Sequence, residues 1–119
     1  MIETGAMTWA AVLAVAAGGA VGAVVRHLLT LAPWGARRGV LVANTVGSAG
    51  LGALVALVDS PVLLLLLGTG LCGALTTWST LAVQAEELGR RSPGRAVAFV
   101  TLNVVLGLGA AVIMLVLLG

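Results

Sequence analysis

Long apolar runs alternate with short polar stretches along the 119-residue chain. Four of these runs are long enough to be membrane spans, because a helix needs roughly 20 apolar residues to cross about 30 Å of hydrocarbon. The pattern therefore predicts an all-α integral membrane protein in which residues 1–119 form one four-helix domain. The expected spans are about 7–31, 39–58, 61–85 and 96–118.

The third run contains a polar, glycine-rich interruption. Between Gly68 and Leu81 the chain has three glycines and five hydroxyl side chains. A helix broken in hydrocarbon leaves backbone groups unsatisfied, each at a cost of several kcal/mol, so a break is expected only where protein or a cavity surrounds it. We therefore expect the third helix to be broken near its middle, from Gly70 to Thr77, and we expect function at this break.

Small residues recur four positions apart in the other three runs. Such spacing places small side chains on one helix face, where it lets backbones approach closely in lipid. The simplest interpretation of each pair is helix packing. The pairs are Gly18 and Gly22, Ala43 and Gly47, Ser48 and Gly52, and Gly107 and Ala111.

Composition agrees with a membrane protein and excludes several functions. Hydrophobic residues make up 61% of the chain and charged residues 8%, which no soluble domain of this size can accommodate. A net charge of +2 in such a chain reflects membrane topology rather than a nucleic-acid partner. Cys72 is the only cysteine, so no disulfide or cysteine-based metal site is expected. No carboxylate lies within a span and no nucleophile–base pair is present, so we do not expect an enzyme.

The arginines predict the orientation of the chain. With four spans, both termini and the Asp59 turn lie on one side, and the other two loops lie opposite. The terminal side has no Lys or Arg, whereas five arginines occupy the opposite loops, and short cytoplasmic loops are the ones enriched in basic residues. We therefore expect a cell (inner) membrane protein with its termini outside and these arginines in the cytoplasm: Arg37, Arg38, Arg90, Arg91 and Arg95.

Several polar side chains fall inside the predicted spans. Arg26 is either a functional charge or an arginine that snorkels to the interface. Asn44, and Asn103 with it, is either a hydrogen-bonding link between helices or a donor facing a polar path. Hydroxyls such as Thr76 often bond back to carbonyls one turn earlier. Trp78 is unusual in mid-span, because a buried indole N–H needs an acceptor.

These residues together resemble the Fluc (CrcB) family of small fluoride channels, and the likeness is colinear over essentially the whole chain. The third span carries its most specific part, Gly68-Thr-Gly-x-Cys-Gly73-x-Leu-Thr76-Thr77-x-Ser79-Thr80. The first and second spans contribute Gly18-Gly19-x-x-Gly22-x-x-x-Arg26 and Gly39-x-Leu-x-x-Asn44-x-x-Gly47-Ser48.

The resemblance implies an antiparallel, dual-topology-type dimer in the lipid membrane, with two narrow anion pathways and a central structural sodium ion. Sodium would be bound by the backbone carbonyls of Gly73 and Thr76 from each subunit. Arg26 would supply positive potential at the vestibule or anchor the fold. The fluoride pathway would include Asn44, Trp78, Ser79, Thr80 and Leu81.

The chain also departs from the family pattern. Trp78 and Leu81 replace two phenylalanines whose ring edges face the ion, Gln84 replaces an acidic residue, and Gly107 stands where a polar side chain is expected. The fixed orientation predicted above does not suit a homodimer of inverted copies. We therefore expect one half of a heterodimer, paired with an oppositely oriented homologous subunit.

Three functions follow from these observations. The first is passive fluoride export that lowers cytoplasmic fluoride, without a coupled ion. The second is a non-conducting structural subunit that orients and stabilises a conducting homologue, which Leu81 and Gln84 favour. The third is a small proton-coupled multidrug transporter, but that fold uses a glutamate within its first helix, and here the nearest acid is Glu3, before the span.

Overall fold

The computed structural model describes residues 6–119, which form helices and short connections without a strand. Glu3 and the expected outward N-terminus fall outside this range. Four helical stretches in it are long and apolar enough to cross a membrane, which confirms the predicted number of spans. Their elements are α1 (Ala6–Thr30), α2 (Ala36–Leu57), a segmented third span, and α6 (Pro93–Leu118); the third span consists of α3 (Pro61–Leu64), η1 (Leu65–Cys72), α4 (Gly73–Leu75) and α5 (Ser79–Arg91).

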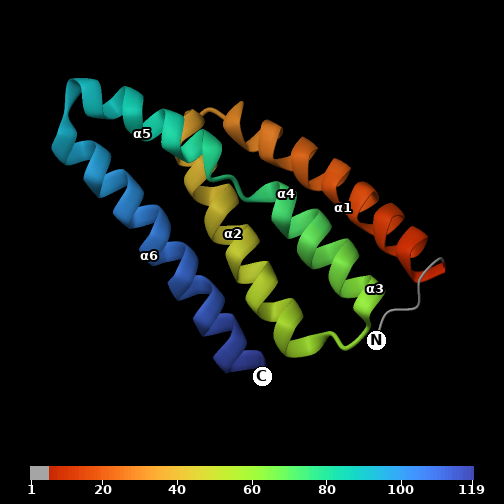
Figure 1. Ribbon diagram of the computed structural model, residues 1–119. Helices are drawn as coiled ribbons and strands as arrows, with labels where there is room; N and C mark the ends of the chain where they lie inside the picture. Colours follow the sequence, from red (N-terminus) through yellow and green to blue (C-terminus); the bar gives the residue numbers. More distant parts are fainter. Residues whose placement is uncertain (1–5) are drawn as a thin grey trace.

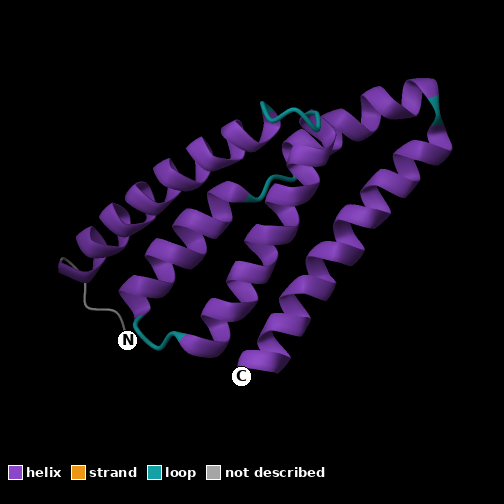
Figure 2. Ribbon diagram, turned by 180° about the vertical axis from the view of Figure 1, so that it is seen from behind, coloured by secondary structure: helices purple, strands orange, loops and turns teal. Residues whose placement is uncertain are grey.

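The helices form two packed pairs that share the centre of the bundle. α1 packs along η1 and α4, and α2 packs along α6 while also contacting α1 and η1. Figure 1 shows α6 on the outer side of α2, the α3–α4 part of the third span between α1 and α2, and α5 beside the first part of α6. Seen from behind, connections lie at the two ends of the bundle, and one further loop interrupts the third span partway along (Figure 2).

Small residues hold the helices close together, as their spacing predicted. A Cβ added at Gly18 would collide with the carbonyl oxygen of Leu66, and one added at Gly52 with that of Ala111. At Gly47 an added Cβ would lie 2.5 Å from the Thr76 methyl group. These glycines therefore set the spacing of α1 to η1, of α2 to α6, and of α2 to the break.

The break is shorter than predicted and begins later. It covers residues 76–78, whereas Gly70 and Gly73 remain helical. Gly70 is a packing residue, since a Cβ there would lie 3.0 Å from the Cα of Gly18. The glycines were interpreted as breakers, but the chain uses them for close approach to α1. The sequence also gave no indication that η1 is wound as a π-helix, with i→i+5 hydrogen bonds.

The predicted connection from Glu86 to Arg95 is also shorter in the structure. α5 continues to Arg91, only Ser92 lies outside a helix, and α6 begins at Pro93. Ser92 Oγ accepts a 3.4 Å hydrogen bond from the Arg95 N–H, and proline suits the first helical position, where its missing N–H costs nothing. The Ser92-Pro93 pair therefore starts α6 immediately instead of extending a loop.

Candidate functional site at the helix break

The break redirects two backbone N–H groups. In a continuous α-helix the N–H of Thr77 would pair with the carbonyl of Gly73, and that of Thr80 with the carbonyl of Thr76. Instead Thr77 N–H donates to Asn44 Oδ1 over 2.7 Å, and Thr80 N–H donates to Thr77 Oγ1 over 3.2 Å. The carbonyls of Gly73 and Thr76 are thereby released from helical pairing. The Gly73 carbonyl lies 3.3 Å from Thr76 Oγ1 and shares the single hydrogen of that hydroxyl with the Cys72 carbonyl.

Thr76 ends the helical part before the break. Its N–H and its Oγ1 both donate to the Cys72 carbonyl, over 3.0 and 3.1 Å. This is the local back-bonding expected from hydroxyls in membrane helices. Gly73 and Thr76 border one hollow of about 340 Å³ between α2 and η1, together with Gly47, Ser48, Leu51, Gly68, Thr69 and Cys72.

Two buried amides connect the break to α6. Asn44 is 9% exposed and Asn103 is 4% exposed. Asn44 Nδ2 donates to Asn103 Oδ1 over 3.0 Å, and Asn103 Nδ2 donates to the Phe99 carbonyl over 2.9 Å. With the Thr77 bond, one chain of hydrogen bonds runs from the break through α2 to α6. Asn44 is therefore an interhelical link, one of the two roles considered for it.

A cavity of about 470 Å³ adjoins this chain of hydrogen bonds. Three of the predicted pathway residues border it: Asn44, Trp78 and Leu81. The other two, Ser79 and Thr80, do not border it. Ser79 is exposed at the start of α5, and Thr80 is half-buried. The remaining lining comes from α2, the break and α6: Ser48, Leu51, Thr76, Thr77, Asn103, Val104, Gly107, Leu108 and Ala111.

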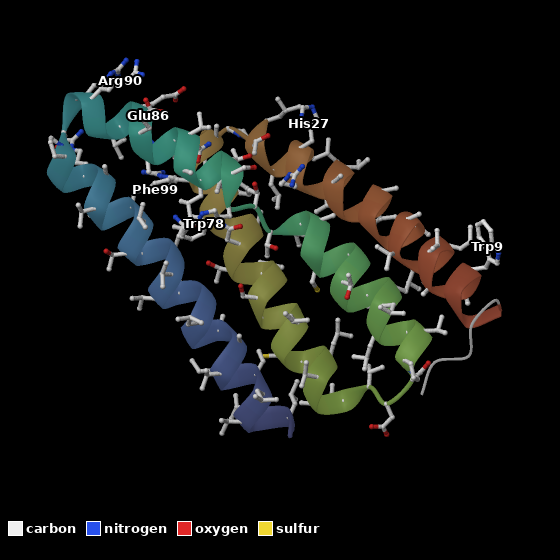
Figure 3. The ribbon with its side chains drawn as sticks, in the orientation of Figure 1. Trp9, His27, Trp78, Glu86, Arg90 and Phe99 are labelled. Atoms are coloured by element: carbon white, nitrogen blue, oxygen red, sulfur yellow. The ribbon has the colours of Figure 1, made fainter. Side chains whose placement is uncertain are left out.

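The two residues at the aromatic positions are placed differently. Trp78 is 69% exposed in the single chain, whereas Leu81 is 3% exposed. Figure 3 shows Trp78 beside the break, toward α6. The expectation of a buried indole in need of an acceptor is therefore not met within one subunit. Trp78 instead presents its ring at the rim of the cavity.

Arg26 caps the helical end that the break creates. Its Nη1 donates to the Ala74 carbonyl over 3.0 Å, and a continuous helix would have paired that carbonyl with the Trp78 N–H. A cation near a helix C-terminus also interacts favourably with the helix dipole. Arg26 thus makes a direct contact with the break, as the anchoring role requires, while its vestibule role remains a prediction.

Replacing Arg26 with methionine is expected to destabilise the protein by about 1.5–3 kcal/mol, the usual contribution of a hydrogen bond to a charged group. The loss should appear as a lower midpoint of thermal unfolding in detergent. His27→Gln is the matched control, because His27 is exposed on the next position of α1. Equal midpoints for Arg26→Met and His27→Gln would contradict the capping role.

Thr77 is the site residue that the sequence reasoning missed. It is 8% exposed, it accepts the Thr80 N–H, and its own N–H is bound by Asn44. A signal was present, because a threonine three residues before a helical N–H is the usual capping arrangement. It was obscured because the break was expected to end at Thr77 rather than to extend past it.

Comparison with known proteins agrees with the sequence motifs. Residues 13–115 match the family model described as CrcB-like protein, Camphor Resistance (CrcB). A protein of Methanopyrus kandleri named fluoride-specific ion channel FluC is 42% identical over 92% of this chain and 88% of its own. Two further relatives come from Halobacterium salinarum. The one named fluoride-specific ion channel FluC 1 is 42% identical over 92% of each chain, and the one named FluC 2 is 48% identical over 65% of this chain and 64% of its own.

Proposed function

This chain belongs to the CrcB-like family, and on that basis we propose that it is a fluoride-selective channel subunit that lowers cytoplasmic fluoride by passive export. Fluoride is proposed as the conducted ion because relatives of this chain are named fluoride-specific ion channel FluC. The observation that carries the proposal is the buried Asn44–Thr77 contact at the break, beside a cavity whose lining residues include no carboxylate.

The break offers donors that suit a small, strongly hydrated anion. The Asn44 amide nitrogen carries two hydrogens, and its bond to Asn103 uses one of them. Thr77 Oγ1 accepts from Thr80 N–H, so its own hydrogen can point elsewhere. Fixed donors of this kind can replace the water lost by an anion that enters a narrow path. Trp78, Ser79, Thr80 and Leu81 would extend the path toward the subunit surface.

The structural sodium ion remains part of the proposal. The released carbonyls of Gly73 and Thr76 are oxygen donors, which hard cations prefer, and both residues border the same hollow. These carbonyls, from this chain and from its partner subunit, would together hold the ion that the resemblance implies. Bound there, sodium would supply a fixed positive charge that stabilises the carbonyl ends of the break.

We further propose that the working channel is an antiparallel heterodimer in the cell (inner) membrane. Five arginines at one end of the bundle and none at the other favour a single orientation, with the termini outside. The exposed Trp78 ring and the apolar part of the adjoining cavity suit coverage by a second subunit. The names FluC 1 and FluC 2 within one organism are compatible with paired paralogues.

Fluoride efflux from liposomes, followed with a fluoride electrode, tests the proposal. This chain purified alone is expected to give no rapid efflux. Liposomes that also contain an oppositely oriented homologue should release fluoride rapidly. The same liposomes should not release chloride. Rapid efflux from this chain alone would contradict the heterodimer but keep the channel. A folded mixed dimer without fluoride efflux would contradict the channel itself.

A further inference from the structure

A charged hollow lies at the arginine-rich end of the bundle, remote from the break. It measures about 300 Å³ and is bordered by Arg37 of α2 and by Glu87, Arg90 and Arg91 of α5. Figure 3 shows Arg90 and Glu86 projecting from this end of the molecule. Two different spans thus contribute to one polar hollow, at the end of the bundle that is predicted to face the cytoplasm.

Positive charge in the hollow is only partly compensated within the protein. Three guanidinium groups face one carboxylate there. Among the described residues, the one ion pair joins Arg90 to Glu86 over 2.8 Å, and both side chains are well exposed. Exposed pairs of this kind contribute little. Arg37 and Arg91 are exposed and have no carboxylate partner within residues 6–119.

Local backbone geometry adds to the positive potential. α2 begins at Ala36, one residue before Arg37 of the hollow, and its first turn has no acidic residue. The first N–H groups of a helix carry partial positive charge and favour anions. Arg37 lies in this first turn, so the helix terminus adds to the positive potential near Arg37.

One exposed apolar side chain, that of Val83, lies next to the hollow on the side of the membrane interior. Val83 lies four residues before Glu87 on α5, and residues at this spacing share a helix face. Val83 is 54% exposed, so it offers the upper part of an acyl chain an apolar contact beside the charged hollow. A soluble anion would make no use of that contact, whereas a lipid uses both parts.

We propose that this hollow binds the phosphate diester headgroup of an anionic membrane lipid, with Arg37 and Arg91 as the main phosphate contacts. Guanidinium groups bind phosphate oxygens through paired N–H donors. Basic pockets between spans at the cytoplasmic side are suited to acidic lipid headgroups. Glu87 opposes the headgroup and keeps binding moderate. This site is independent of fluoride conduction.

Thermal unfolding of the full chain in detergent tests the site. Short-chain phosphatidylglycerol is expected to raise the unfolding midpoint in a saturable way, and phosphatidylcholine of the same chain length is not. The double variant R37Q/R91Q should raise the half-saturating concentration of phosphatidylglycerol about 30-fold, since each arginine near a membrane surface is worth about 1 kcal/mol. The control variant R38Q/R95Q removes two arginines that lie at the same end but outside the hollow. It should raise the half-saturating concentration less than about threefold.

A variant of opposite sign keeps the test decisive if R37Q/R91Q does not fold. Glu87→Gln removes the opposing carboxylate and should tighten phosphatidylglycerol binding by about fivefold. An unchanged or weaker affinity in that variant would overturn the proposal. So would equal losses in the two arginine pairs, which indicate diffuse attraction. A saturable rise with inorganic phosphate alone would show a soluble-anion site instead of a lipid site.

Discussion

The substitution Asn44→Ala is expected to lower fluoride efflux about 30-fold or more in the mixed dimer of this chain with an oppositely oriented homologue. Asn44 receives the Thr77 N–H at the break and donates to Asn103 on α6. The second hydrogen of the Asn44 amide is the proposed donor to fluoride, and a hydrogen bond to a charged group is worth about 1.5–3 kcal/mol. A loss of about 2 kcal/mol on the conduction barrier corresponds to about 30-fold in rate. Efflux is measured with a fluoride electrode at matched amounts of folded dimer.

Thr45→Val is the matched control for Asn44→Ala. Thr45 is the next residue of α2, and its buried hydroxyl has no hydrogen-bond partner among the described residues. Its removal should change efflux by less than about twofold, because no bond is lost. Normal efflux in Asn44→Ala would mean that this subunit only supports a conducting partner. Equal losses in both variants would show a general disturbance of α2.

The substitution Gly18→Ala is expected to destabilise the fold by about 3 kcal/mol, the upper end of the range for overpacking. The added methyl group would collide with the Leu66 carbonyl oxygen and lie 2.9 Å from the Leu71 nitrogen. Backbone atoms of η1 cannot rotate aside as a side chain can, so α1 has to move away from the third span. The unfolding midpoint in detergent and the yield of monodisperse protein report this loss.

Gly19→Ala isolates the effect of contact from the effect of glycine itself. Nothing lies within 4 Å of a Cβ built at Gly19, and alanine is a better helix former by about 1 kcal/mol. This variant should be as stable as the natural chain or slightly more so. If Gly18→Ala and Gly19→Ala have the same unfolding midpoint, the close approach of α1 and η1 does not contribute to stability as described.

The four spans were predictable because hydrophobic length is a direct consequence of membrane thickness. The third span was the least predictable, because glycine serves two purposes that look alike in a sequence. At Gly70 it permits contact with Gly18, while the actual break begins at Thr76. What distinguishes these cases is the neighbouring helix, which a single sequence does not specify.

The candidate site was predicted in its parts but not in its connections. Asn44 was identified because an amide in lipid needs a partner, yet its two partners lie 33 and 59 residues away. Such long-range pairing depends on how α2 packs against the break and α6. Likewise Arg26 was recognisable as a costly charge, but its bond to the Ala74 carbonyl exists only because the helix stops there.

The π-wound segment Leu65–Cys72 bears on how the length of this span can vary between homologues. A π-turn closes its hydrogen-bonded ring with one residue more than an α-turn. A homologue that lacks one residue within this segment can therefore rewind it toward an α-helix while keeping α4 and the break in place. Single-residue gaps aligned to positions 65–72 would then leave the downstream register intact, whereas the same gap at positions 76–78 would displace the Thr77 N–H from Asn44.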